Sequence, residues 1–133
     1  MLVFALVALA ASAQVGEVRS LASGTLTNTA TLTSPVVTNT SSYNAITFQV
    51  KAVNVSGTTA GTSILKASVD GLSYVTIADA AGLVKGYPND TLTLSNGVIW
   101  NVVIQDAPWK YYQISTTGTD TQTTTMSYKY ILK

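Results

Sequence analysis

The side chains that could carry out acid–base or metal chemistry are few and poorly grouped. Almost all of the acidic residues fall in segments that read as turns, where an aspartate accepts hydrogen bonds from its own backbone. A glycosidase-like pair would need two carboxylates held about 5–9 Å apart on rigid strands. The acidic residues are Glu17, Asp70, Asp79, Asp90, Asp106 and Asp120. We therefore predict turn formers and no metal site, with calcium binding by the loop over residues 79–90 as the alternative.

Histidine and cysteine are both absent from the chain. Without histidine the commonest general base and the usual metal ligand are missing, so a serine triad cannot be assembled. Without cysteine there is no thiol nucleophile, no sulfur-ligated zinc and no disulfide. The sequence predicts a protein that is not an enzyme, with no catalytic residues and no cofactor.

Aromatic residues crowd the C-terminal third of the chain and are the more informative set. Buried rings contribute packing area and a polar tip, whereas exposed rings can stack on sugar faces. The members of this set are Trp100, Trp109, Tyr111, Tyr112, Tyr128 and Tyr130. We interpret them as packing residues. The alternative is a ligand-binding platform of Trp109, Tyr111 and Trp100, in which Trp109, beside Pro108 in a turn, is the most exposed.

The composition describes one weakly charged domain. A chain of 133 residues can bury one real core, and only 10 % of its residues are charged, against roughly a quarter in ordinary soluble domains. A net charge of +1 gives no basic footprint for nucleic acid. Low charge also means little repulsion between copies, which is compatible with a protein that packs against its neighbours.

The elements that must position these residues read as β-strands. Ile46–Val53 alternates cleanly, with Ile46, Phe48, Val50 and Ala52 on one face, as in a half-buried antiparallel strand. Thr62–Ile77 carries Asp70-Gly71 between two strand-forming runs and predicts a β-hairpin that anchors the fold.

Three further segments give more specific predictions. Asn96-Gly97 predicts a second hairpin, and the apolar run Val98–Ile104 after it predicts a central strand covered on both faces or a strand at a subunit contact. Thr116–Thr125 reads as the two arms of one hairpin. Ser34-Pro35 breaks a strand, which Val36-Val37 resumes at a sheet edge.

About eight such strands, separated by glycine, proline and asparagine turns, predict an all-β fold. No convincing helix follows residue 22. We expect an antiparallel β-sandwich, jelly-roll-like, over residues 23–133, and a closed barrel is the alternative. Residues 1–22 form a separate apolar N-terminal segment.

The N-terminal segment has two competing interpretations. Met1–Ala13 is apolar and ends in Ala-Ser-Ala before Gln14, as in a cleaved signal peptide, although no lysine or arginine precedes the apolar run. It is short for a membrane span. The alternative is a retained helix or arm, running to about Leu21, that anchors the chain in an assembly or contacts a membrane. Its anchoring residues would be Leu2, Val3, Phe4, Leu6, Val7 and Leu9.

Several segments resemble small β-sandwich virion proteins of bacteriophages, of the capsid decoration, minor capsid and head-fibre type. In that group an SGT-containing loop leads into an SxDG-xxY hairpin, and an aromatic PYxYYRI-like strand precedes a final GTGT strand. The resemblance covers roughly residues 45–133. Gln113 stands where an arginine is common, and the signal-like start also departs from the group. The matching segments are Val55–Gly61, Ser63–Tyr74, Ala107–Ile114 and Thr116–Lys133.

The resemblance implies a non-enzymatic structural protein of a phage virion, such as a decoration, minor capsid, fibre or spike component, that acts through subunit packing. Its partners would be itself, in a homo-oligomer, and other structural proteins, with no nucleic acid. It would be located in the virion, and residues 1–13 could contact a membrane. The alternatives are a secreted or cell-surface adhesive module that binds a surface glycan, and a subunit of an extracellular filament.

Overall fold

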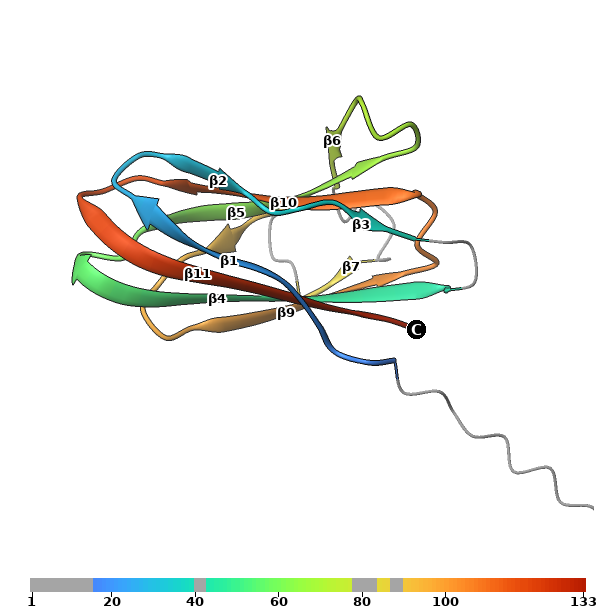
Figure 1. Cartoon of the computed structure of the whole chain (residues 1–133), viewed down its shortest axis with the longest axis horizontal. Coiled ribbons are helices and arrows are strands. Elements are labelled where there is room, and N and C mark those ends of the chain that lie inside the picture. The colour runs from blue at the N-terminus through green and yellow to red at the C-terminus, as the bar shows by residue number, and fades with distance from the viewer. Residues whose placement is uncertain (1–15, 40–42, 78–83, 87–89) are drawn as a thin grey trace, which may run out of the picture.

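The computed structural model describes residues 16–39, 43–77, 84–86 and 90–133. These residues form eleven β-strands in two facing sheets and no α-helix (Figure 1). The antiparallel β-sandwich expected from the sequence is confirmed. The strand number exceeds eight because several strands are only two or three residues long. None of the described segments is a helix long and apolar enough to span a lipid bilayer.

One sheet, sheet A, contains five strands. Its order is β1-β11-β4-β9-β7, and each neighbouring pair is antiparallel. Strand β11 therefore lies between β1 and β4, although these three strands are far apart in the sequence. The strands of sheet A are β1 (Arg19–Thr27), β4 (Ala45–Gly57), β7 (Val84–Lys85), β9 (Ile99–Gln105) and β11 (Gln122–Leu132).

The other sheet, sheet B, is built on the pair β5 and β10. Two short strands, β2 and β3, both pair with β10 on either side of Ser34-Pro35, which confirms the predicted break and the resumed edge strand. A proline is tolerated there because an edge strand has one side free of the ladder. The strands of sheet B are β2 (Thr31–Thr33), β3 (Val37–Thr38), β5 (Gly61–Ser68), β6 (Val75–Thr76), β8 (Leu92–Thr93) and β10 (Tyr111–Gly118).

The chain passes from one sheet to the other at almost every connection, which is a jelly-roll-like order. Two predicted hairpins are wrong for this reason. Asn96-Gly97 joins β8 of sheet B to β9 of sheet A, and residues 119–121 join β10 of sheet B to β11 of sheet A. The turn residues mark a reversal correctly, but they do not determine whether the next strand pairs within the same sheet.

The prediction that the run Val98–Ile104 is a central strand covered on both faces is also wrong within the single chain. Strand β9 has only the two-residue β7 on one side, and its outward Ile99 is 47 % exposed. Its inward Val102 and Ile104 are fully buried. The alternative interpretation, a strand at a subunit contact, stays a prediction.

The core lies between the sheets and follows the alternation read from the sequence. Ile46, Phe48, Val50 and Ala52 of β4 are all buried, as predicted. The Phe48 ring lies 6.2 Å from the Tyr112 ring of β10, centroid to centroid, so it connects the two layers. Burial of such side chains is the main driving force for folding.

One part of the interior is polar and internally hydrogen-bonded. The Tyr128 hydroxyl of β11 donates to Thr116 Oγ1 of β10 at 2.7 Å, and Thr116 Oγ1 also lies 2.7 Å from Ser63 Oγ of β5. All three residues are buried. Burial raises the pKa of Tyr128, although its hydrogen bond to Thr116 opposes the shift. The three hydroxyl groups thus form a hydrogen-bonded link between the two sheets. Replacing one of them with an apolar side chain would leave its partner without a hydrogen bond.

Replacing Thr116 with valine should therefore destabilise the fold by about 1–3 kcal/mol, because the Tyr128 hydroxyl is left buried without its partner. Urea unfolding measures this change. The matched control is Thr31→Val, which removes an exposed Thr31–Thr117 contact and should change stability by less than about 0.5 kcal/mol. Equal losses for the two variants would contradict the prediction.

The structure describes only the last residues of the predicted N-terminal segment, from residue 16 onward. Residues 1–13, with all the proposed anchoring residues, lie outside the described residues. Strand β1 begins at Arg19, which lies opposite Tyr130 of β11. The sandwich thus begins before residue 23, and residues 19–21 are strand, in contrast to the helix running to Leu21.

Candidate interaction surface

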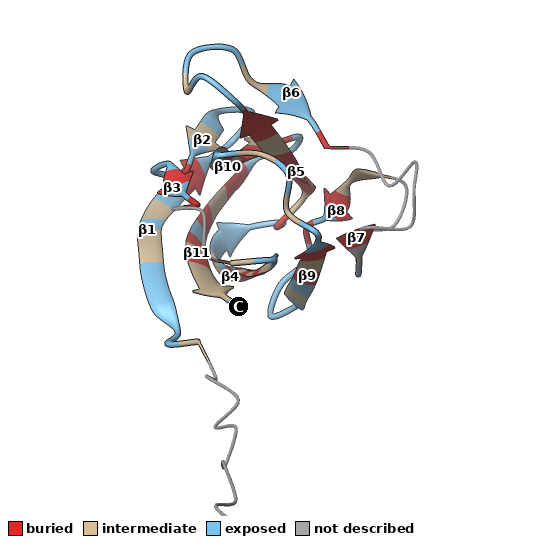
Figure 2. Ribbon diagram, turned by 90° about the vertical axis from the view of Figure 1, so that its right-hand side faces the viewer, coloured by how far each residue is buried: buried red, intermediate tan, exposed pale blue. Residues whose placement is uncertain are grey.

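The most distinctive exposed feature is the loop between β5 and β6. Figures 1 and 2 show this segment standing clear of the two sheets. Three large aliphatic side chains face solvent here: Val69 (74 % exposed) and Leu72 (87 %) in the loop, and Val75 (57 %), the first residue of β6. Exposed apolar side chains that gather on one part of a soluble protein are a common feature of contact sites. We call residues 69–75 the apolar loop.

The apolar loop is held in one shape by Asp70. Its carboxylate Oδ1 accepts hydrogen bonds from the Leu72 amide (2.8 Å), the Ser73 amide (2.9 Å) and the Ser68 hydroxyl (2.7 Å). The Gly71 amide in turn donates to Ser68 Oγ at 2.9 Å. Donors aimed at a carboxylate favour its charged form. The Ser73 amide, followed by the Leu72 amide and the Ser68 hydroxyl, lowers the pKa of Asp70 to about 2.

The hairpin predicted at Asp70-Gly71 exists, but the prediction that a tight turn closes it is wrong. Lys66 lies opposite Thr76, and Ala67 lies opposite Val75, so the residues 68–74 separate the last paired positions. Gly71 has the positive φ expected of a turn glycine (+78°), but Asp70 instead uses its side chain to bond the backbone that follows. A side-chain turn of this kind accommodates a wider loop.

The apolar loop should lose its order when Asp70 becomes neutral. The folded-state pKa is lowered, so the stabilising contribution is complete above the ordinary value of 3.8 and is lost as the pH falls through about 2. NMR titration should place the Asp70 carboxyl near pH 2. In the Asp70→Ala variant, the Leu72 and Ser73 amides should exchange faster with solvent at neutral pH, whereas Ile114 in β10 should not change. Unchanged exchange would contradict this account.

The aromatic residues predicted as a ligand platform do not share one surface. Trp109 packs edge-on against Tyr112, with centroids 6.3 Å apart, and its backbone amide donates to the Tyr112 hydroxyl at 3.1 Å. Trp100 is partly buried against the core and donates to the Thr93 carbonyl. Tyr111 alternates with the buried Tyr112, so it faces out of sheet B. Trp100, Trp109 and Tyr111 are all half-buried, and a binding role for any of them stays a prediction.

Tyr111 instead supports the apolar loop. Its ring lies beneath Gly71, where an added Cβ would be only 3.3 Å from a ring carbon, and Lys110 Nζ lies 5.3 Å from the ring centroid. Burial raises the pKa of its neighbour Tyr112 to about 12, so the Tyr112 hydroxyl stays protonated across the physiological pH range.

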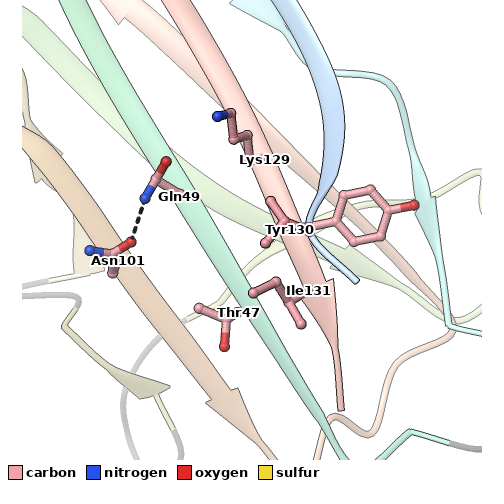
Figure 3. A pocket seen from close by; sticks show the side chains of 7 residues that line it. Thr47, Gln49, Asn101, Lys129, Tyr130 and Ile131 are labelled. Atoms are coloured by element: carbon pink, nitrogen blue, oxygen red, sulfur yellow. Dashed lines mark hydrogen bonds between the residues drawn. The ribbon is translucent and has the colours of Figure 1, made fainter. Parts of the chain in front are cut away.

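The outer face of sheet A carries a shallow hollow of about 70 Å³ (Figure 3). On its floor the Gln49 side chain donates to Asn101 Oδ1 at 3.1 Å, and Lys129 extends beside them. The two amides bind each other and leave further hydrogen-bonding capacity toward solvent. The hollow is lined by Val18, Thr47, Gln49, Asn101, Lys129, Tyr130 and Ile131.

The outer face of sheet A also carries exposed apolar side chains close to the place where β4 and β9 pair. Ile99 of β9 lies opposite Lys51 of β4, and Val53 is the next outward residue along β4. Val55 and Val98 are exposed close by, beside the turn in which Asn96 Oδ1 accepts from the Asn54 amide. We call Val53, Ile99 and Lys51 the sheet A patch.

The described aspartates lie at turns or bends, whereas Glu17 lies outside any turn, before β1. Asp90 and Asp106 have positive φ angles of 58° and 48°, and Asp120 accepts from the Thr121 amide. Over the described ranges no three acidic side chains gather closely enough to hold a metal. Most of the loop over residues 79–90 lies outside the described residues, so the calcium alternative is not tested there.

The sequence did not single out Val69, Leu72 and Val75, because each looked like an ordinary strand residue. The available signal was their position. An apolar residue on both sides of Asp70-Gly71 places large side chains at the reversal itself, where polar residues are usual.

The fold resembles solved structures more clearly than the sequence resembles known families. No protein-family model and no curated protein matches the sequence. The PBSX exported protein XepA superposes with a TM-score of 0.63 at 12 % identity, over 88 % of this chain. The aligned part is 37 % of the XepA chain. A mitogen derived from Yersinia pseudotuberculosis aligns over 90 % of this chain and 88 % of its own, at 10 % identity and a TM-score of 0.48. The XepA match shows a shared all-β fold.

Proposed function

We propose that this chain is a structural component of a phage particle and that it acts through contacts with other protein subunits. The apolar loop carries the proposal, because three large aliphatic side chains are presented to solvent on a segment ordered by Asp70. Ordering before binding lowers the entropy cost of forming a contact. The fold shared with XepA, an exported protein of the phage PBSX, supports a phage origin.

The size of the apolar loop indicates what kind of contact it can make. Full burial of Val69, Leu72 and Val75 would contribute about 1.5–3 kcal/mol each. Association costs an estimated 4–15 kcal/mol in lost freedom of motion. One such contact is therefore weak by itself. It becomes effective where many identical contacts act together, as they do in a capsid lattice, fibre or spike.

The test is incorporation into particles made by cells that carry the phage genes. Mass spectrometry of purified particles should detect the wild-type chain. Leu72→Asp should reduce its incorporation at least about tenfold, because it removes the largest apolar contribution and adds a charge to the interface. Val36→Asp, a matched change at another exposed aliphatic position, should be incorporated normally. Absence of the wild-type chain from particles would overturn the proposal.

The hollow on sheet A favours a second candidate, a secreted or surface module that binds a glycan. Paired amides beside a tyrosine and a lysine offer donors and acceptors for sugar hydroxyls. This candidate expects the chain in the culture medium or on the cell surface, and expects glycan-array binding that Asn101→Ala abolishes. Detection in particles together with no binding to any glycan would exclude it.

A further inference from the structure

We propose that copies of this chain associate head to tail, with the apolar loop of one copy seated on the sheet A patch of the next. The inference rests on the proposed structural role and names the partner of the apolar loop as a second copy. Three independent observations support it: the positions of the two surfaces, their charges, and their aliphatic character.

The two surfaces lie at opposite ends and on opposite layers of the sandwich. Strand β5 follows β4 directly, so the end of β4 at Gly57 and the start of β5 at Gly61 share one end of the molecule. The apolar loop follows the other end of β5, in sheet B, whereas the sheet A patch lies in the second half of β4 (Figure 1). The apolar loop of a chain therefore cannot reach its own patch, but it can reach that of another copy.

The charges of the two surfaces are complementary. None of the five described strands of sheet A contains an aspartate or glutamate, whereas Arg19, Lys51 and Lys129 all lie on them. The apolar loop carries Asp70, which remains ionised at any physiological pH. Lys51 lies directly opposite Ile99. An approaching apolar loop would thus place its aspartate near a lysine while its aliphatic side chains meet Val53 and Ile99.

A contact between two different surfaces is heterologous, so repeating it produces a ring if the rotation closes and a filament if it does not. A contact of the apolar loop with a second apolar loop would instead close after two copies. The two arrangements therefore predict different products from the same protein.

The absence of cysteine from the sequence makes disulfide trapping a clean test. Full-length Leu72→Cys and Ile99→Cys variants are mixed at high concentration and oxidised, and dimers are counted by mass spectrometry. The mixed Leu72→Cys/Ile99→Cys dimer should form about tenfold more than either homodimer. The control is Val36→Cys mixed with Leu72→Cys, which should give no excess. Thermal melting checks that each variant is folded, as expected for exposed positions.

A predominant Leu72→Cys homodimer would overturn the inference in favour of a loop-to-loop contact, and equal amounts of all dimers would overturn it in favour of random collision. Neither result would contradict the proposed function, because that function is tested separately by incorporation into particles. If the chain is incorporated but the mixed dimer does not form, only the head-to-tail contact fails.

Discussion

Replacing Phe48 with alanine is expected to destabilise the protein by about 3–5 kcal/mol, the usual cost of removing a large aromatic ring from a packed core. Phe48 has no solvent exposure, lies on β4 between β9 and β11, and contacts Tyr112 of the opposite sheet. Its loss opens a cavity between the layers that neither sheet can close alone. Small domains have about 5–15 kcal/mol of stability in total, so the variant would be near the limit of folding.

Thermal unfolding should show the midpoint of the Phe48→Ala variant lowered by about 10–20 °C. Val53→Ala is the matched control, because Val53 lies on the same strand but faces solvent. It should shift the midpoint only slightly. A comparable shift in both variants would mean that the Phe48 side chain is not packed between the two sheets as described.

Replacing Gly61 with alanine should cost about 3 kcal/mol or more, through a different mechanism. Gly61 has a φ of +144° and lies opposite Gly118 across the β5–β10 ladder. A Cβ at this position would lie 2.2 Å from the Thr117 carbonyl oxygen and 2.9 Å from Gly118 Cα, both of which are backbone atoms. The strands would have to separate where the chain enters sheet B.

Gly97→Ala separates the steric contribution from the backbone strain. Gly97 also has a positive φ, +76°, but a Cβ there would have no atom within 4 Å. This control should cost only about 1–2 kcal/mol, the strain of a left-handed L-residue. Chemical denaturation of the two variants tests the difference. Equal losses would show that the close approach of Gly61 and Gly118 is unimportant.

The sequence predicted those parts of the fold that depend on local periodicity. The alternation along Ile46–Val53 identified four buried residues correctly, because a strand that faces a core on one side must alternate. Ser34-Pro35 identified an interrupted edge strand, because proline lacks the amide donor of a central strand. Both patterns are determined by a few neighbouring residues.

Pairing between strands could not be predicted in the same way. Asn96-Gly97 is a strong hairpin signal, yet it joins β8 to β9 in opposite sheets. The hydrogen bond from the Gly97 amide to the Ala52 carbonyl shows that this turn is bound to β4, more than forty residues earlier. Long-range partners of this kind leave no signal in the neighbouring residues. The positions of the turns could therefore be predicted from the sequence, but the pairing of the strands could not.

The candidate site was predicted least well. The sequence suggested the aromatic residues as site candidates because they suit both packing and sugar stacking. In the structure, Trp109 and Trp100 pack against the core, and the Tyr111 ring packs beneath Gly71. The exposed side chains of the apolar loop are aliphatic and resemble core residues in sequence. Only the three-dimensional structure, in which Asp70 orders the backbone of this segment, shows that Leu72 is exposed to solvent.

The central place of β11 in sheet A has a consequence for biosynthesis. Residues 122–132 join β1 to β4, and they are synthesised after all the other described strands of the sandwich. Before β11 is made, β1 and β4 have no common neighbour, so the nascent chain exposes unpaired strand edges until this strand has been synthesised. Folding that waits for such distant partners is slow, typically milliseconds to seconds. A chain terminated before Gln122 would leave both edges permanently open, and we expect it to aggregate in the cell.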